Sequence, residues 1–308
     1  MADDSAPEPA AAALDHALAV AGRHDLQLDP ATAHLEEAGL DYRVVLADDS
    51  DGTRWVLRLP RRGDVSDGMD AEARILELVA PRLADHGVAV PDWRIRSREL
   101  IAYPALGGDP GLTIDNGEPE WHIDPADPGY ADRLGRLLAA LHTIPVAEAT
   151  AAGMEIRTPD QVRQSWSDDI ATVLAEFPVD PTLSEAWRAW LDDDACWPDR
   201  TVPTHGEIYP AHLLFDADGA ITGVLDWTTA RVDDPARDLA AQYGAAGEDM
   251  LNRTIEAYAE AGGHVHAGLA AQARHLWDAS PVGYALYALT TGEQEHLDGA
   301  VAMLAAPD

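Results

Sequence analysis

The segment from His205 to Asp238 carries three side chains whose types and spacing suit phosphoryl transfer. Glu207 lies on an incoming loop, His212 follows five residues later, and Asp226 stands beyond a predicted hairpin. In this reaction one carboxylate orients the attacking hydroxyl and accepts its proton, while other groups hold the magnesium that neutralises the phosphate oxygens. We therefore interpret Glu207 as the base, and His212 and Asp226 as metal ligands.

The hairpin is predicted by two apolar runs, residues 213–216 and 221–225, which are joined by Asp218-Gly219. Aspartate followed by glycine favours the tight turn of an antiparallel hairpin. Pairing of the two runs would bring the backbones of His212 and Asp226 to roughly 5 Å from each other. The hairpin therefore predicts that the two metal ligands lie close together.

This stretch resembles the catalytic loop of the aminoglycoside phosphotransferase family, whose members are distant relatives of protein kinases. The usual text of the family is H-G-D-x-x-x-x-N, followed by a hairpin and I-D-W; this chain has HGEIYPAH from residue 205 and LDW from residue 225. Histidine at position 212 and the segments 55–62 and 282–293 are most similar to the macrolide 2′-phosphotransferases. Together these features cover most of the chain from about residue 37 onward.

The resemblance implies an α+β, two-lobed fold of the protein-kinase type. It divides the chain into a disordered tail over residues 1–9, a small β-rich N-terminal lobe that binds nucleotide over 10–103, and a larger, mainly helical lobe over 104–308. The C-terminal lobe would carry the catalytic groups and bind the substrate.

The pattern of the N-terminal lobe agrees with a kinase-like start. Apolar periodicity predicts a helix over 10–23, strands over 42–46 and 54–59, and a helix over 70–83. By resemblance, Arg58 replaces the kinase lysine that contacts the nucleotide phosphates, and Glu72 is its partner. Arginine can bind phosphate through two N–H donors. The alternative is an exposed Arg58 and Glu72 on solvated faces.

Further nucleotide contacts are expected where the lobes join. A strand is predicted over 100–103, and residues 104–108 read as a linker. By resemblance, the backbone groups of Ile101, Ala102 and Tyr103 would bind the edge of the nucleobase. The glycine-rich loop that covers the phosphates in kinases is reduced to Gly39.

The C-terminal lobe is predicted to be helical. Leucines at 134, 137, 138 and 141 follow the spacing of a core-facing helical stripe, and further helices are predicted around 166–177 and 183–191. Tryptophans at 166, 187, 190 and 197 have two equally weighted interpretations, core packing or a wall for a large apolar substrate.

By resemblance, His205 and Asp238 brace the catalytic loop. The candidate substrate contacts are Tyr209, Asp233, Asp234, Trp277 and Tyr284. Of these, the two aspartates would suit a cationic substrate.

The acidity of the chain limits its partners. It has 55 acidic and 21 basic residues, giving a formal net charge of −34 at pH 7. Such a charge repels phosphate backbones and anionic lipid surfaces, so we expect neither nucleic acid nor membrane as a partner. All basic residues are arginine, which excludes the lysine-containing phosphate loop G-x-x-x-x-G-K-[ST].

We expect a cytoplasmic protein. The sequence shows no signal-peptide pattern and no apolar run of about 18 residues. Cys196 is the only cysteine, which excludes an intramolecular disulfide and a cysteine-based metal site.

The resemblance implies an antibiotic-modifying kinase that transfers the γ-phosphate of GTP, or of ATP, to the 2′-hydroxyl of a macrolide and so confers resistance. One or two Mg²⁺ ions would be its cofactors. An aminoglycoside or another small alcohol is the alternative acceptor. A nucleotide-binding pseudokinase is the second alternative, because Glu207 stands where the family has aspartate and the extra carbon moves the carboxylate by about 1.5 Å.

Overall fold

The structure is a computed structural model that describes every residue except 1–9, 37–41, 62–67, 116–117 and 306–308. The tail predicted over 1–9 and the phosphate-loop glycine Gly39 lie outside the described residues.

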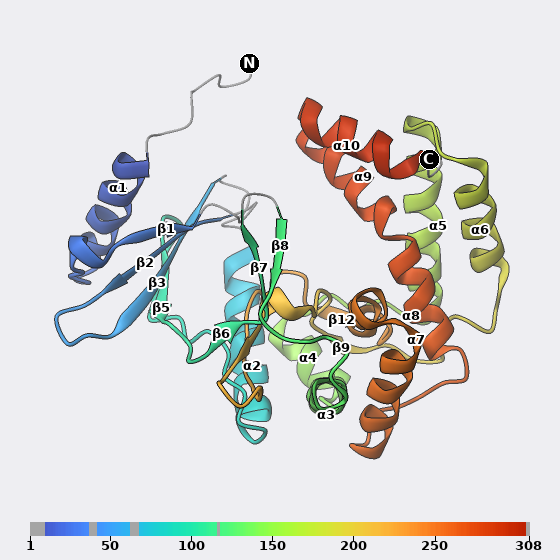
Figure 1. Cartoon of the computed structure of the whole chain (residues 1–308), viewed down its shortest axis with the longest axis horizontal. Coiled ribbons are helices and arrows are strands. Elements are labelled where there is room, and N and C mark those ends of the chain that lie inside the picture. Colours follow the sequence, from blue (N-terminus) through green and yellow to red (C-terminus); the bar gives the residue numbers. More distant parts are fainter. Residues whose placement is uncertain (1–9, 37–41, 62–67, 116–117, 306–308) are drawn as a thin grey trace.

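A five-stranded antiparallel sheet forms the N-terminal part of the chain (Figure 1). Its order is β1 (His34–Glu36), β2 (Tyr42–Asp48), β3 (Arg54–Pro60), β5 (Ile101–Pro104) and β4 (Ile95–Arg96). Helix α1 (Ala10–Arg23) packs on one face, while the start of α2 (Met69–Ala84) packs on the other. The predicted helices and strands of this region are confirmed.

Alternation along β3 determines which side chains face the rest of the molecule. Leu57 and Leu59 pack with α1, whereas Val56 packs on the opposite face with Ile101 and Tyr103. Arg58 shares the second face, because side chains alternate along a strand. The strand therefore presents Arg58 toward α2 and the helical part.

Helices dominate the remainder of the chain. They are α3 (Pro128–His142), α4 (Val146–Ala152), α5 (Pro159–Glu176), α6 (Pro181–Asp192), α7 (Arg237–Glu260), α8 (Leu269–Asp278), α9 (Ser280–Thr291) and α10 (Gln294–Leu304). The predicted leucine stripe of α3 is buried along its whole length, as expected. None of the helices within the described residues is long and apolar enough to cross a bilayer.

The predicted hairpin is confirmed as β10 (Leu213–Phe215) and β11 (Ile221–Val224), which pair antiparallel. At its open end, the Leu225 N–H donates to the His212 carbonyl at 2.8 Å, so the segments leading to His212 and Asp226 are held together. A third strand, β6 (Asp109–Pro110), pairs with β10. The chain near the hairpin also contains β9 (Val202–Thr204), η3 (Pro210–His212) and β12 (Arg231–Asp233).

A second hairpin, β7 (Leu112–Asp115) with β8 (Glu118–Trp121), was not predicted. It lies between the N-terminal sheet and the C-terminal helices (Figure 1). Its charged residues and Pro119 hide the strand signal, because proline and acidic residues are depleted in strands.

Candidate active site

The catalytic loop connects β9 to η3 and turns sharply at Gly206. Gly206 has φ +94°, and a Cβ at this position would lie 2.8 Å from the Thr229 carbonyl oxygen and 2.8 Å from a nitrogen of Arg237. Glycine tolerates this left-handed conformation, and here it also avoids the clash. The turn places Glu207 on the wall of a cavity.

Asp238, on the first turn of α7, fixes this loop by hydrogen bonds to its backbone. Its two carboxylate oxygens accept from the backbone N–H groups of His205, at 2.9 Å, and Gly206, at 2.6 Å. His142, at the end of α3, contributes a third contact at 3.0 Å. Although burial opposes ionisation, these contacts lower the pKa of Asp238 below its ordinary value.

His205 is buried and neutral. Burial lowers its pKa to about 4. Its Nε2–H donates to the Leu225 carbonyl at 2.8 Å, and its Nδ1 accepts from the Glu207 N–H at 3.3 Å. The imidazole thus links the catalytic loop to the segment that carries Asp226.

Asp226 has features of a functional position. Its φ is +57°, which is uncommon for a residue other than glycine. The Thr228 hydroxyl donates to its Oδ1 at 2.6 Å. Burial opposes ionisation, but Arg58 and Thr228 outweigh it and lower the pKa of Asp226. The Asp226 carboxylate is therefore kept charged, close enough to Arg58 for the guanidinium to favour its ionised form.

Of the two predicted metal ligands, Asp226 fits a magnesium ion, whereas the imidazole of His212 is a ligand that softer metals prefer. His212 Nδ1 donates to the Glu207 carbonyl at 2.9 Å, which leaves the lone pair of Nε2 for a ligand. Asp226 supplies carboxylate oxygen. The described residues contain no cluster of three such groups that could hold a metal, and Mg²⁺ is usually bound by one or two carboxylates plus substrate phosphates.

Arg58 and Glu72 form a buried ion pair. The closest nitrogen–oxygen distance is 3.3 Å, and each residue is about 7% exposed or less. The guanidinium carbon also lies 4.0 Å from the ring centroid of Tyr42. Burial raises the pKa of Glu72, while Arg58 opposes this shift. The alternative of two solvated, exposed side chains is wrong.

If Arg58 contacts the nucleotide phosphates, as the resemblance predicts, Arg58→Met should lower kcat/KM for the nucleotide by about one to two orders of magnitude, because a charge-assisted contact is lost. It should also reduce the melting temperature, since Glu72 stays buried without its partner. The double variant Arg58→Met/Glu72→Gln should recover stability but not activity. Recovery of the nucleotide kcat/KM in the double variant would show that the pair is only structural.

The prediction that Ile101 and Ala102 offer backbone groups to a nucleobase is wrong. Both residues pair with β3 on one side and β4 on the other. The Ala102 carbonyl accepts from the Arg94 N–H at 2.9 Å. Tyr103 pairs with Val56 of β3. These backbone groups therefore form hydrogen bonds within the sheet and are not free for a ligand.

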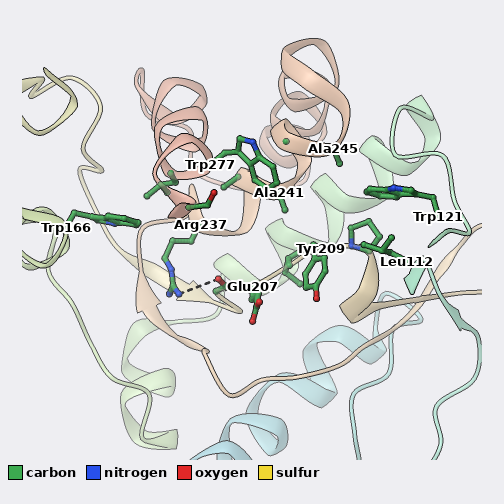
Figure 2. Close-up of a pocket in the computed structure, with 16 residues that line it drawn as sticks. Leu112, Trp121, Trp166, Glu207, Tyr209, Arg237, Ala241, Ala245 and Trp277 are labelled. Atoms are coloured by element: carbon green, nitrogen blue, oxygen red, sulfur yellow. Dashed lines mark hydrogen bonds between the residues drawn. The ribbon is translucent and has the colours of Figure 1, made fainter. Parts of the chain in front are cut away.

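A cavity of about 680 Å³ opens beside Glu207. Figure 2 shows Trp166, Trp277 and Trp121 around it, with Glu207 and Tyr209 at its base. Two of the predicted substrate residues, Tyr209 and Trp277, therefore line this space. Glu207 is the one carboxylate among the described residues that line it, and Arg237 is the one guanidinium.

The four tryptophans have separate roles. Trp187 and Trp190 are buried in the core. Trp166 lines the cavity and contacts Trp190 edge to face, with ring centroids 5.2 Å apart. Trp197 stacks on Trp190, with ring centroids 5.1 Å apart. Core packing is thus confirmed for Trp187 and Trp190, while Trp166 lies on the cavity, where a wall for the substrate stays a prediction.

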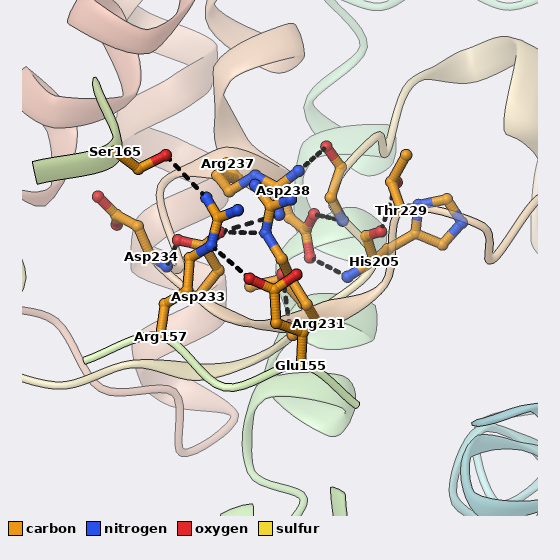
Figure 3. A network of polar contacts seen from close by, with 12 residues as sticks. Glu155, Arg157, Ser165, His205, Thr229, Arg231, Asp233, Asp234, Arg237 and Asp238 are labelled. Carbon is orange, nitrogen blue, oxygen red and sulfur yellow. Dashed lines mark hydrogen bonds and ion pairs between the residues drawn. The ribbon is translucent and has the colours of Figure 1, made fainter. Parts of the chain in front are cut away.

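The prediction that Asp233 and Asp234 contact a cationic substrate is wrong, because both are buried and belong to a network of polar contacts (Figure 3). Asp234 accepts from the Ala236 N–H at 2.9 Å and from Gln272 at 2.7 Å. Three arginines surround the Asp233 carboxylate: Arg157, Arg231 and Arg237. These contacts leave neither carboxylate facing the cavity.

Tyr284 was also a predicted substrate contact, and its position contradicts this. The Tyr284 hydroxyl lies 3.1 Å from Nδ1 of His296, which belongs to α10. Tyr284 is not among the residues that line the cavity. It packs α9 against α10 instead.

Several residues of the site were not predicted. Trp121 comes from the unpredicted β7–β8 hairpin, and His142 follows the α3 leucine stripe without a distinguishing signal. Arg237 could have been found because it is the neighbour of Asp238 in the sequence. Its guanidinium is 3.4 Å from the Gly206 carbonyl. Thr228 follows Asp226 by two residues.

A small β-sheet part, a helical part and a catalytic loop between Arg58 and the cavity define a phosphotransferase of the kinase-like class. The model of the phosphotransferase enzyme family matches residues 32–279, and the chain belongs to this family. The predicted fold class and the predicted enzyme class are thereby confirmed.

Similar proteins agree with this assignment. A crystal structure of macrolide 2′-phosphotransferase MphH from Brachybacterium faecium is 50% identical, with a TM-score of 0.88, covering 96% of this chain and 99% of that one. A macrolide 2′-phosphotransferase type I is 42% identical, with a TM-score of 0.89 over 96% and 98% of the two chains. Protein YcbJ of Bacillus subtilis is 38% identical over 276 residues, 88% of this chain and 89% of that protein.

An aminoglycoside kinase structure, the GDP and kanamycin complex of APH(2″)-IIIa, is only 19% identical. Its TM-score is 0.74 over 94% of this chain and 96% of that one. At this identity the likeness supports the fold alone.

Proposed function

We propose that this enzyme transfers the γ-phosphate of a purine nucleoside triphosphate to the 2′-hydroxyl of a macrolide antibiotic. The observation that carries the proposal is the apolar, tryptophan-lined cavity next to Glu207. A macrolide is a large apolar ring with an amino sugar, and it needs a wide hydrophobic wall with few charges. An aminoglycoside carries several cationic amines, for which a single carboxylate in the lining is a poor match.

The residues have complementary roles in this reaction. Glu207 accepts the proton of the attacking hydroxyl as the new oxygen–phosphorus bond forms and the bond to the nucleotide diphosphate breaks. His212 and Asp226 would hold Mg²⁺, which neutralises phosphate charge when bound. Arg58, kept in place by Glu72, would contact the phosphates. His205 and Asp238 are positioning residues for the loop.

We propose GTP as the preferred donor, with ATP as a second one, as the resemblance to the macrolide 2′-phosphotransferases implies. The nucleobase would meet backbone groups after Tyr103, in the segment 104–107. Nucleoside triphosphates are cytoplasmic metabolites, so the reaction belongs in the cytoplasm. Phosphorylation of the 2′-hydroxyl would remove ribosome affinity and give resistance.

Phosphate transfer from GTP and from ATP to erythromycin tests this function, with kanamycin as the alternative acceptor. We expect nucleotide turnover to rise at least about tenfold with erythromycin and to remain at its basal level with kanamycin. Stimulation by kanamycin instead would favour an aminoglycoside acceptor. Nucleotide binding without turnover on either acceptor would favour the pseudokinase alternative, in which Glu207 is a poor base.

A further inference from the structure

After Arg237 at its start, α7 presents only very small residues to the cavity. Four of them line the cavity: Ala240, Ala241, Gly244 and Ala245. Gly244 differs from the others because the Trp277 indole occupies the space that a side chain at position 244 would fill. A Cβ on Gly244 would lie 2.2, 2.3 and 2.4 Å from three carbon atoms of the Trp277 indole. No real Cβ contact is this short, so the indole and a side chain at 244 exclude each other.

Trp277 is a wall of the same cavity and extends from α8. It is 41% exposed, so a large aromatic surface is open to the space beside Glu207 (Figure 2). The indole ring lies directly against the backbone of α7 at Gly244. It therefore narrows the space between this helix and a ligand as little as an indole can. Any residue with a side chain at 244 would push the indole away from α7 and toward the open cavity.

Conformational preference does not explain a glycine here. Gly244 lies inside α7 without a positive φ, and glycine is unfavourable in a helix interior relative to alanine. Gly247, three residues later, is different because its φ of +77° favours glycine on backbone grounds. The one observed property of position 244 that requires glycine is the contact with Trp277.

We propose that Gly244 is a specificity-determining residue: it seats the Trp277 indole on α7 and thereby keeps the cavity wide enough for a bulky macrocyclic acceptor. The inference rests on the proposed function, and it adds which residue sets the size of the acceptor. Gly244 acts through Trp277 and does not need to touch the nucleotide or the reacting hydroxyl.

Gly244→Ala tests this role through the acceptor. We expect the KM for erythromycin to rise about tenfold or more, as is typical of overpacking, with the KM for GTP and the basal GTP hydrolysis changed less than about twofold. Gly283→Ala is the matched control. Gly283 is an exposed glycine in α9, and a Cβ there would meet no atom within 4 Å. It should leave both KM values unchanged.

Trp277→Ala provides the decisive comparison. It also shows whether an effect of Gly244→Ala comes from the indole or from misfolding of the variant. If Gly244 acts through the indole, adding Gly244→Ala to Trp277→Ala should leave the erythromycin KM unchanged and should not lower the melting temperature, because alanine is favoured over glycine inside a helix. An equal tenfold penalty in both backgrounds would overturn the inference, as would an unchanged erythromycin KM in Gly244→Ala. Wild-type enzyme that neither binds nor phosphorylates erythromycin would overturn the proposed function and the inference together.

Discussion

Asp226→Asn should lower phosphoryl transfer by about 10³-fold, because the variant loses the charged carboxylate oxygen that suits a hard metal ion between enzyme and phosphates. The fold should persist. Asparagine is one of the residues that tolerates positive φ, so it is compatible with the +57° of this position. Its side-chain oxygen also retains an acceptor for the Thr228 hydroxyl. The measurement is kcat/KM for GTP with erythromycin as acceptor, across a series of Mg²⁺ concentrations.

Asp218→Asn is the matched control for this variant, because Asp218 lies at the exposed turn of the same hairpin. It removes the same charge from the same element and should leave transfer unchanged. Asp226→Asn with wild-type turnover and an unchanged Mg²⁺ requirement would reject Asp226 as a metal ligand. An equal loss in both variants would indicate a general effect of charge or of hairpin stability.

Local patterns predicted much of the fold. The Asp218-Gly219 signal predicted the hairpin of β10 and β11, which forms with a register shift between Leu214 and Phe215, and its pairing brings the segments of His212 and Asp226 together. Period-two alternation in β3 placed Arg58 on the face opposite Leu57. These predictions succeeded because a turn type and a side-chain period depend on neighbouring residues alone.

Predictions failed where distant segments decide the outcome. The Asp233 and Asp234 side chains are acidic and close to the catalytic loop in sequence, but arginines from β12, α7 and the segment before α5 enclose Asp233. Likewise, β4 pairs with β5 and occupies backbone groups of Ile101 and Ala102 that were expected to face a nucleotide. Sequence periodicity does not indicate whether a further strand pairs along the free edge of a given strand.

The setting of Glu207 includes charges from several elements. His212 comes from η3, Asp226 follows β11, and Arg237 begins α7. Burial is the largest influence and raises the pKa of Glu207, Asp226 raises it further, and His212 and Arg237 oppose the shift. A raised pKa makes the carboxylate a stronger proton acceptor when it is ionised, which suits a general base.

Glu207→Gln should lower kcat for phosphate transfer by about 10²-fold or more, since the amide keeps the size of the side chain but accepts no proton. For the wild type, kcat/KM should fall as the pH decreases through the pKa of Glu207. Because that pKa is raised, the fall should begin at a higher pH than for an ordinary glutamate. This limb of the pH profile should disappear in Glu207→Gln. Glu185→Gln, an exposed change on α6, is the control for charge and should behave like the wild type.

Glu207→Asp then separates an adapted loop from a disabled one. The left-handed turn at Gly206, held by Asp238 and approached by Arg237, determines where the side chain of residue 207 starts. If this loop is built for glutamate, the shorter aspartate lies about 1.5 Å short of the acceptor hydroxyl, and kcat should decrease by about 10²-fold. A higher kcat in Glu207→Asp than in the wild type would identify Glu207 as a defect in the catalytic loop. Full activity of Glu207→Gln in phosphate transfer from GTP to erythromycin would falsify its role as the base.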